Sequence, residues 1–146
     1  MLDDLSSALA LRLRDLARMA DRLDRLESGT GEWLKLQRAE DWSAAATEMT
    51  LRALRVAAEP TNFAILSFLS TRTTAPPVEL EQAVGLGRLA VTQRVNDLIQ
   101  VGLAARNIDT DQVQGTAAGA ALVEWINGII DQVAKTLVET LQPVTR

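Results

Sequence analysis

Residues 84–103 read VGLGRLAVTQRVNDLIQVGL, and this stretch decides the fold. Gly85 and Gly87 flank a single leucine, so a helix that precedes them ends there and another helix follows. A short connection that contains glycine lets two helices cross at a wide angle, which leaves the second helix projecting outward. The sequence therefore predicts a tight turn followed by a projecting helix over 88–101.

This projecting helix mixes apolar and polar residues. The apolar residues expected to face inward are Leu89, Ala90 or Val91, Val95, Leu98 and Ile99. Between them lie side chains that can bond to base edges or hold phosphates, namely Arg88, Thr92, Gln93, Arg94 and Asn96. We expect Thr92 and Gln93 to read bases in a major groove. Arg88 and Arg94 would then hold the DNA backbone. The alternative is an ordinary solvated helix face.

The flanking segments fit a small DNA-binding unit. Proline at position 60 ends one helix and begins the next, over 60–70, which is apolar nearly all round and should lie in the core. The linker over 71–77 cannot be helical. Two short strands are expected over 103–107 and 112–116, and a long helix over 117–141. This order is that of a winged helix-turn-helix, so the fold class expected is mainly α with a small β-wing.

Part of this region resembles a known family. The stretch 59–69, EPTNFAILSFL, resembles the opening helix of ArsR-type winged-helix regulators in its acidic-Pro-Thr start and Ile-Leu-x-x-Leu continuation. The exit from the wing in ArsR, MarR and PadR relatives is similar to residues 116–119. The turn and recognition helix of the ArsR family are similar to residues 84–86, 91–98 and 102–103. The resemblance spans 59–130 and implies a homodimeric DNA-binding transcriptional regulator, with repression as its expected mode.

Two features depart from that family. Many members sense metals through Cys, His and acidic ligands, and this chain has no Cys and no His, so we expect no metal site of that kind. The wing carries one cation, Arg106, which we count among the expected DNA-binding residues, beside Asp109 and Asp111, which phosphates would repel. Over 60–119, four arginines against five carboxylates leave a net charge of −1, which opposes DNA binding. A dimer would partly compensate by presenting two reading helices about 34 Å apart.

The segments outside this unit are expected to pack or dimerise. We divide the chain into an N-terminal helical segment (1–58), the winged helix-turn-helix (59–119) and a C-terminal helix (120–146). Leucines seven residues apart predict a coiled-coil stripe on the first helix, and the long helix carries a similar stripe. The residues expected at a dimer interface are Leu2, Leu9, Leu16, Leu23, Leu122, Trp125, Ile129 and Val133. The alternative is that the first helix packs against other helices of its own chain.

Composition and the absence of certain motifs argue against several classes of function. The chain has 146 residues, 47% of them apolar, and a net charge of −4. No grouping of Ser, Lys and carboxylates forms a catalytic motif, so we expect neither an enzyme nor a cofactor. No signal peptide or membrane span is evident, so a cytoplasmic protein is expected. The prediction is a dimeric repressor that binds double-stranded DNA, with an unknown small-molecule effector as a further partner. The alternative function is a winged-helix protein-interaction module that does not bind DNA.

Overall fold

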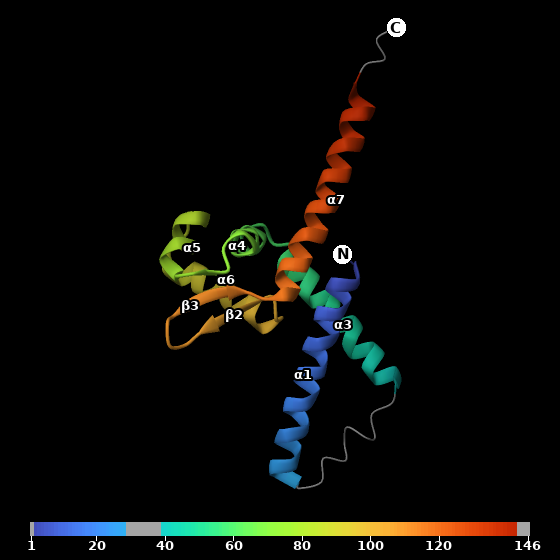
Figure 1. The fold of residues 1–146 in the computed structure, drawn as a ribbon, viewed down its shortest axis with the longest axis vertical. Helices are drawn as coiled ribbons and strands as arrows, with labels where there is room; N and C mark the ends of the chain where they lie inside the picture. Colours follow the sequence, from blue (N-terminus) through green and yellow to red (C-terminus); the bar gives the residue numbers. More distant parts are fainter. Residues whose placement is uncertain (1, 29–38, 143–146) are drawn as a thin grey trace.

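The computed structural model describes residues 2–28 and 39–142 (Figure 1). Within them the chain is mainly helical with one small antiparallel sheet, whose strand order is β1-β3-β2. The elements are α1 (Leu2–Ser28), α3 (Ala39–Ala57), α4 (Pro60–Thr71), β1 (Thr74–Ala75), α5 (Pro77–Val84), α6 (Arg88–Gln100), β2 (Ala104–Asn107), β3 (Gln112–Gly115) and α7 (Ala117–Leu141). This is the expected fold class, a winged helix-turn-helix between flanking helices.

Helix α4 lies at the centre of the core, as its composition predicts. Proline at its first position needs no hydrogen-bond partner, and the Glu59 carboxylate accepts from the backbone N–H of Asn62 at 2.9 Å. The buried Asn62 side chain donates through Nδ2 to the Val56 carbonyl at 2.8 Å, which fastens the end of α3 to the start of α4. Ile65 and Leu66 are fully covered by the surrounding elements.

The wing is a hairpin of β2 and β3 with a short third strand beside it. Arg106 pairs with Val113 across the hairpin, and Val113 also pairs with Ala75 of β1. The linker over 71–77 was predicted to be non-helical, and this was wrong at its two ends, because Thr71 still belongs to α4 and Pro77 occupies the first position of α5, where proline is tolerated. The strand β1 within the linker was not predicted. Two residues are too few to show the alternation by which a strand is recognised.

Helix α7 begins where its backbone passes close to the backbone of Leu103. The Thr116 hydroxyl accepts from the Gly119 N–H at 3.1 Å and donates to the Gly102 carbonyl at 2.7 Å. A Cβ placed on Gly119 would lie only 2.2 Å from the Leu103 carbonyl oxygen. A side chain at 119 is therefore excluded sterically, and its absence lets α7 start directly against the end of α6.

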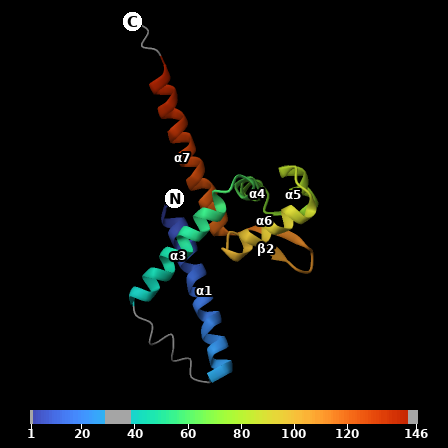
Figure 2. The ribbon, with the colours of Figure 1, turned by 180° about the vertical axis from the view of Figure 1, so that it is seen from behind.

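The first helix packs against the chain's own helices. Helix α1 lies along the start of α7 and crosses α3, as Figures 1 and 2 show from opposite sides. Leu9 is half-buried there, and Leu16 is exposed. Arg12 packs its side chain against Gly102. Leu2 and Leu23 lie outside the residues whose side chains the structure describes.

The long helix α7 divides into a covered half and a projecting half. Leu122, expected at a dimer interface, is instead buried in this chain's core at 2% exposure, because α1 and α4 pack against the start of α7. Trp125 is half-buried at the edge of that contact. Ile129 and Val133 are exposed, and from there the helix extends away from the body (Figure 2). In the described part of the chain, no helix is long and apolar enough to cross a membrane.

Candidate nucleic-acid interface

The turn before α6 aims that helix outward. Gly85 ends α5 in the left-handed region with φ 68°, a conformation that costs glycine little, and its N–H donates to the Glu81 carbonyl. Gly87 then precedes α6 without a side-chain cap, so the first turn of α6 presents free backbone N–H groups. The predicted turn and its helix are confirmed, with α6 starting at Arg88.

One face of α6 is buried and the opposite face is a solvent-exposed ridge. Val91, Val95 and Leu98 point into the core, as expected. The ridge follows helical spacing and is formed by Leu89, Gln93, Asn96 and Gln100. The inward assignment of Leu89 was wrong, because its side chain is 75% exposed. It lies in the first turn of α6, on the side opposite the buried valines.

The α6 residues predicted to contact DNA differ in where they lie relative to the ridge. Gln93 and Asn96 lie on the ridge, and Thr92 is half-buried on its flank. Arg88 stands at the start of the helix with its side chain 68% exposed. Arg94 turns away from the ridge, since its guanidinium lies 3.4 Å from the Glu59 carboxylate at the start of α4. The ridge is thus built of amide and apolar side chains, with the exposed Asp97 and the arginines beside it.

All the arginines of the winged unit have an acidic neighbour. Over 60–119, which the structure describes throughout, each arginine has a nitrogen within 4.0 Å of a carboxylate oxygen. The ion pairs are Arg72–Glu79 at 2.6 Å, Arg88–Asp111 at 3.8 Å, Arg94–Glu59 at 3.4 Å and Arg106–Asp111 at 3.5 Å. Two of these pairs, Arg88–Asp111 and Arg94–Glu59, join distant segments and were not predicted from the sequence pattern. Together the four pairs reduce the positive potential offered to DNA.

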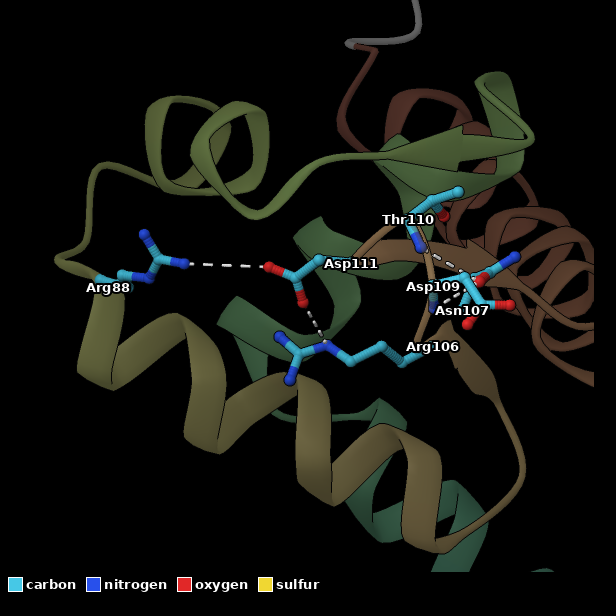
Figure 3. A network of polar contacts seen from close by, with 6 residues as sticks. All are labelled: Arg88, Arg106, Asn107, Asp109, Thr110 and Asp111. Atoms are coloured by element: carbon cyan, nitrogen blue, oxygen red, sulfur yellow. Dashed lines mark hydrogen bonds and ion pairs between the residues drawn. The ribbon is translucent and has the colours of Figure 1, made fainter.

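Asp111 is held in place by the geometry of the wing turn. The Asn107 side-chain oxygen accepts from the N–H groups of Asp109 and Thr110, which closes the turn (Figure 3). Asp111 follows with φ 52°, a left-handed conformation that aspartate tolerates. In the figure its carboxylate lies between the guanidinium groups of Arg88 and Arg106. Ile108 at the tip of the turn is 91% exposed, and its prominence was not predicted.

A separate candidate site, which is concave, lies away from the wing, where α1, α3 and α7 meet. It is an apolar pocket of about 440 Å³. That volume is within the range of small-molecule sites. Its lining is mostly aliphatic, with Trp125 from α7, and comprises Leu5, Ser6, Leu9, Ala10, Leu13, Ala46, Met49, Thr50, Ala53, Leu54, Leu122 and Trp125. Within the described residues, no group of three or more acidic side chains is placed to hold a metal ion.

The fold and the exposed ridge on α6 define a winged-helix protein, and solved structures with the same fold are known regulators. MepR of Staphylococcus aureus, a transcription regulator of the multidrug efflux pump MepA, aligns with a TM-score of 0.54 and 19% identity over 73% of this chain and 86% of its own. A transcriptional regulator homologue from Pyrococcus horikoshii OT3 aligns with a TM-score of 0.52 and 18% identity over 62% and 97%. Ligand-free NadR aligns with a TM-score of 0.52 and 20% identity over 71% and 79%.

These similarities concern the fold. No protein-family model matches the sequence, and no curated protein sequence matches it. The expected winged-helix architecture is confirmed by the structural neighbours, while the resemblance to the ArsR type in particular stays a prediction.

Proposed function

We propose that this protein is a DNA-binding transcriptional regulator that reads the major groove with α6. The observation that carries the proposal is the exposed ridge on α6, where Gln93 and Asn96 project from a helix that a glycine turn directs outward. Amide side chains at such positions form paired hydrogen bonds with adenine. Its structural neighbours described as transcriptional regulators have the same architecture, which supports this assignment.

The arginines beside the ridge would position the protein on phosphates. Arg88 at the start of α6 and Arg106 on the wing lie on either side of Asp111. Since every arginine of the unit has a carboxylate neighbour, phosphate attraction must be weak for a single copy. We therefore expect sequence readout to supply a large share of the affinity and binding to arbitrary DNA to be slight.

We further propose that the regulator acts as a homodimer that represses by occluding a promoter. The projecting half of α7 carries an apolar stripe at helical spacing, formed by Ile129, Val133 and Leu137, each about half exposed. Its charged residues Asp131 and Lys135 lie on the opposite face. A second copy of this helix would cover the stripe, and the dimer would present two reading helices to one duplex.

A small apolar effector is proposed for the pocket between α1, α3 and α7. The pocket adjoins the covered start of α7, through Leu122 and Trp125. A molecule seated there would contact the proposed dimerisation helix directly, so it would change the spacing of the two reading helices. Quenching of tryptophan fluorescence by apolar compounds, lost in a Leu9→Phe variant that fills part of the pocket without adding an indole, would detect such binding.

The DNA proposal is tested by selecting duplexes from a random pool at low salt and measuring affinity by fluorescence anisotropy. Gln93→Ala is expected to reduce affinity for the selected duplex by about tenfold, since a bidentate base contact contributes about 1–3 kcal/mol. Gln132→Ala, an equally exposed glutamine on α7, is the matched control and should bind as the wild type does. Equal losses from both changes would contradict the assignment of the ridge.

The acidic balance favours a second candidate function, a winged-helix module that binds another protein. Its specific support is the pairing of all four arginines in the winged unit with carboxylates. Failure to enrich any duplex even at low ionic strength would favour this module over the regulator.

A further inference from the structure

Asp111 lies between an arginine of α6 and an arginine of the wing. Its two carboxylate oxygens face different arginines: Oδ2 lies 3.8 Å from Nη2 of Arg88, and Oδ1 lies 3.5 Å from Nε of Arg106. One arginine belongs to the reading helix and the other to the wing, so an anion at this point joins the two elements (Figure 3). The uncapped first turn of α6 adds backbone N–H groups that also favour an anion nearby.

These contacts are loose for ion pairs. Charge-assisted hydrogen bonds between guanidinium and carboxylate measure about 2.7–2.9 Å. Both contacts of Asp111 are longer, and the side chains of Arg88 and Asp111 are more than half exposed. The Arg88–Asp111 pair is therefore an exposed one, of a kind that contributes little to stability, whereas Arg106 is 29% exposed and its buried Nε has no hydrogen-bond partner. Another anion, which approaches the same guanidinium groups at hydrogen-bond distance, can therefore displace the carboxylate at small cost.

We propose that Arg88 and Arg106 form a binding site for a DNA backbone phosphate, and that Asp111 occupies this site as an internal competitor. The inference rests on the proposed DNA-binding function and adds a residue that sets selectivity. Before DNA binds, the carboxylate offsets one of the two positive charges and weakens the attraction to any duplex. Binding then requires phosphate to replace Asp111, and only a sequence that also satisfies the ridge on α6 supplies enough affinity. Asp111 thus suppresses non-specific binding while leaving base readout intact.

The chain offers a matched pair of variants for the test. Asp111→Asn removes the charge, and asparagine tolerates the left-handed backbone at this position as aspartate does. Asp109→Asn removes the same charge two residues away in the same turn. Both variants raise the net charge by one unit, so a difference between them reports the contacts of Asp111 rather than the overall charge.

Affinity is measured by fluorescence anisotropy with a labelled random-sequence duplex over a series of salt concentrations. Asp111→Asn is expected to bind about fivefold more tightly than the wild type at low salt. Its logarithmic salt slope should steepen by about one unit, because one more phosphate is held. Asp109→Asn should gain about twofold or less. In an Arg88→Gln, Arg106→Gln background, Asp111→Asn should gain no more than Asp109→Asn does.

The possible failures are distinguishable. Equal gains from the two asparagine variants, or a gain from Asp111→Asn that survives removal of both arginines, would overturn this inference and leave the proposed function standing. If neither the wild type nor Asp111→Asn binds any duplex at low salt, the proposed function itself fails, and the phosphate site with it. The unfolding midpoint of Asp111→Asn should match that of the wild type, which separates a binding effect from a change in folding.

Discussion

The carboxylate oxygen Oε2 of Glu59 accepts a hydrogen bond from the backbone of Asn62 and also lies 3.4 Å from the guanidinium of Arg94. One acidic side chain therefore caps α4 and contacts α6. Arg94 is 38% exposed in this position, so part of its surface stays open to a phosphate. The contact helps to fix the orientation of α6 relative to α4.

Replacing Glu59 separates its two roles. Glu59→Ala removes the cap and the ion pair, and should lower the free energy of unfolding by about 1–2 kcal/mol. Glu59→Gln keeps an acceptor oxygen for the Asn62 N–H and should lose less than half as much. Urea denaturation followed by circular dichroism measures both. A loss from Glu59→Gln as large as that from Glu59→Ala would mean that the charge, rather than the cap, supplies the stability.

Two glycines of α7 should respond to the same substitution with opposite signs. Gly119→Ala sets a methyl group against the Leu103 carbonyl oxygen, and should destabilise the fold by about 2–4 kcal/mol. Gly128→Ala meets no atom within 4 Å and should stabilise the helix by about 0.5–1 kcal/mol. Thermal unfolding of the two variants checks the prediction. Similar shifts in both would contradict the close approach at Gly119.

Leu89 should contact the methyl groups of thymine. It is the apolar member of the exposed ridge on α6, and apolar side chains in the major groove pack on that methyl group. Replacing contacted thymines with uracil in the selected duplex should weaken wild-type binding about threefold to fivefold, the effect of losing one buried methyl group. Leu89→Ala should bind both duplexes equally. Continued preference of Leu89→Ala for thymine would assign the methyl contact to another residue.

The apolar stripe of α7 should be required for dimerisation. Val133→Asp introduces a charge into the stripe, and is expected to convert the dimer to a monomer at micromolar concentration. Val138→Asp makes the same change at a similarly exposed valine on the other side of the helix, and should leave the dimer intact. Multi-angle light scattering measures the mass of each variant. A wild type that is monomeric, or a dimer that survives Val133→Asp, would contradict the proposed interface.

Local patterns predicted the elements well where each pattern is long or strongly marked. The long helix was expected over 117–141 and is observed with those limits, because Thr116 provides a cap and an apolar periodicity follows. The hairpin strands were expected within one residue at each end. The two-residue strand β1 was missed, since it exists only through its pairing with β3.

The candidate site was harder to predict, because its properties depend on residues distant in sequence. The amides Gln93 and Asn96 were assigned from composition and are exposed as expected. The exposure of Leu89 was not predicted, because periodicity cannot say which elements cover the first turn of a helix. The contacts of Arg88 with Asp111 and of Arg94 with Glu59 arise from folding of separate segments against one another. No local pattern encodes such pairs.

The hydroxyl of Thr116 has a mechanical consequence. It begins α7 and at the same time holds the carbonyl of Gly102, at the point where α6 has just ended. The steric fit of Gly119 against Leu103 makes this junction stiff. A change in the direction of α7 should therefore be passed on to the C-terminal end of α6, because these contacts join the two helices directly.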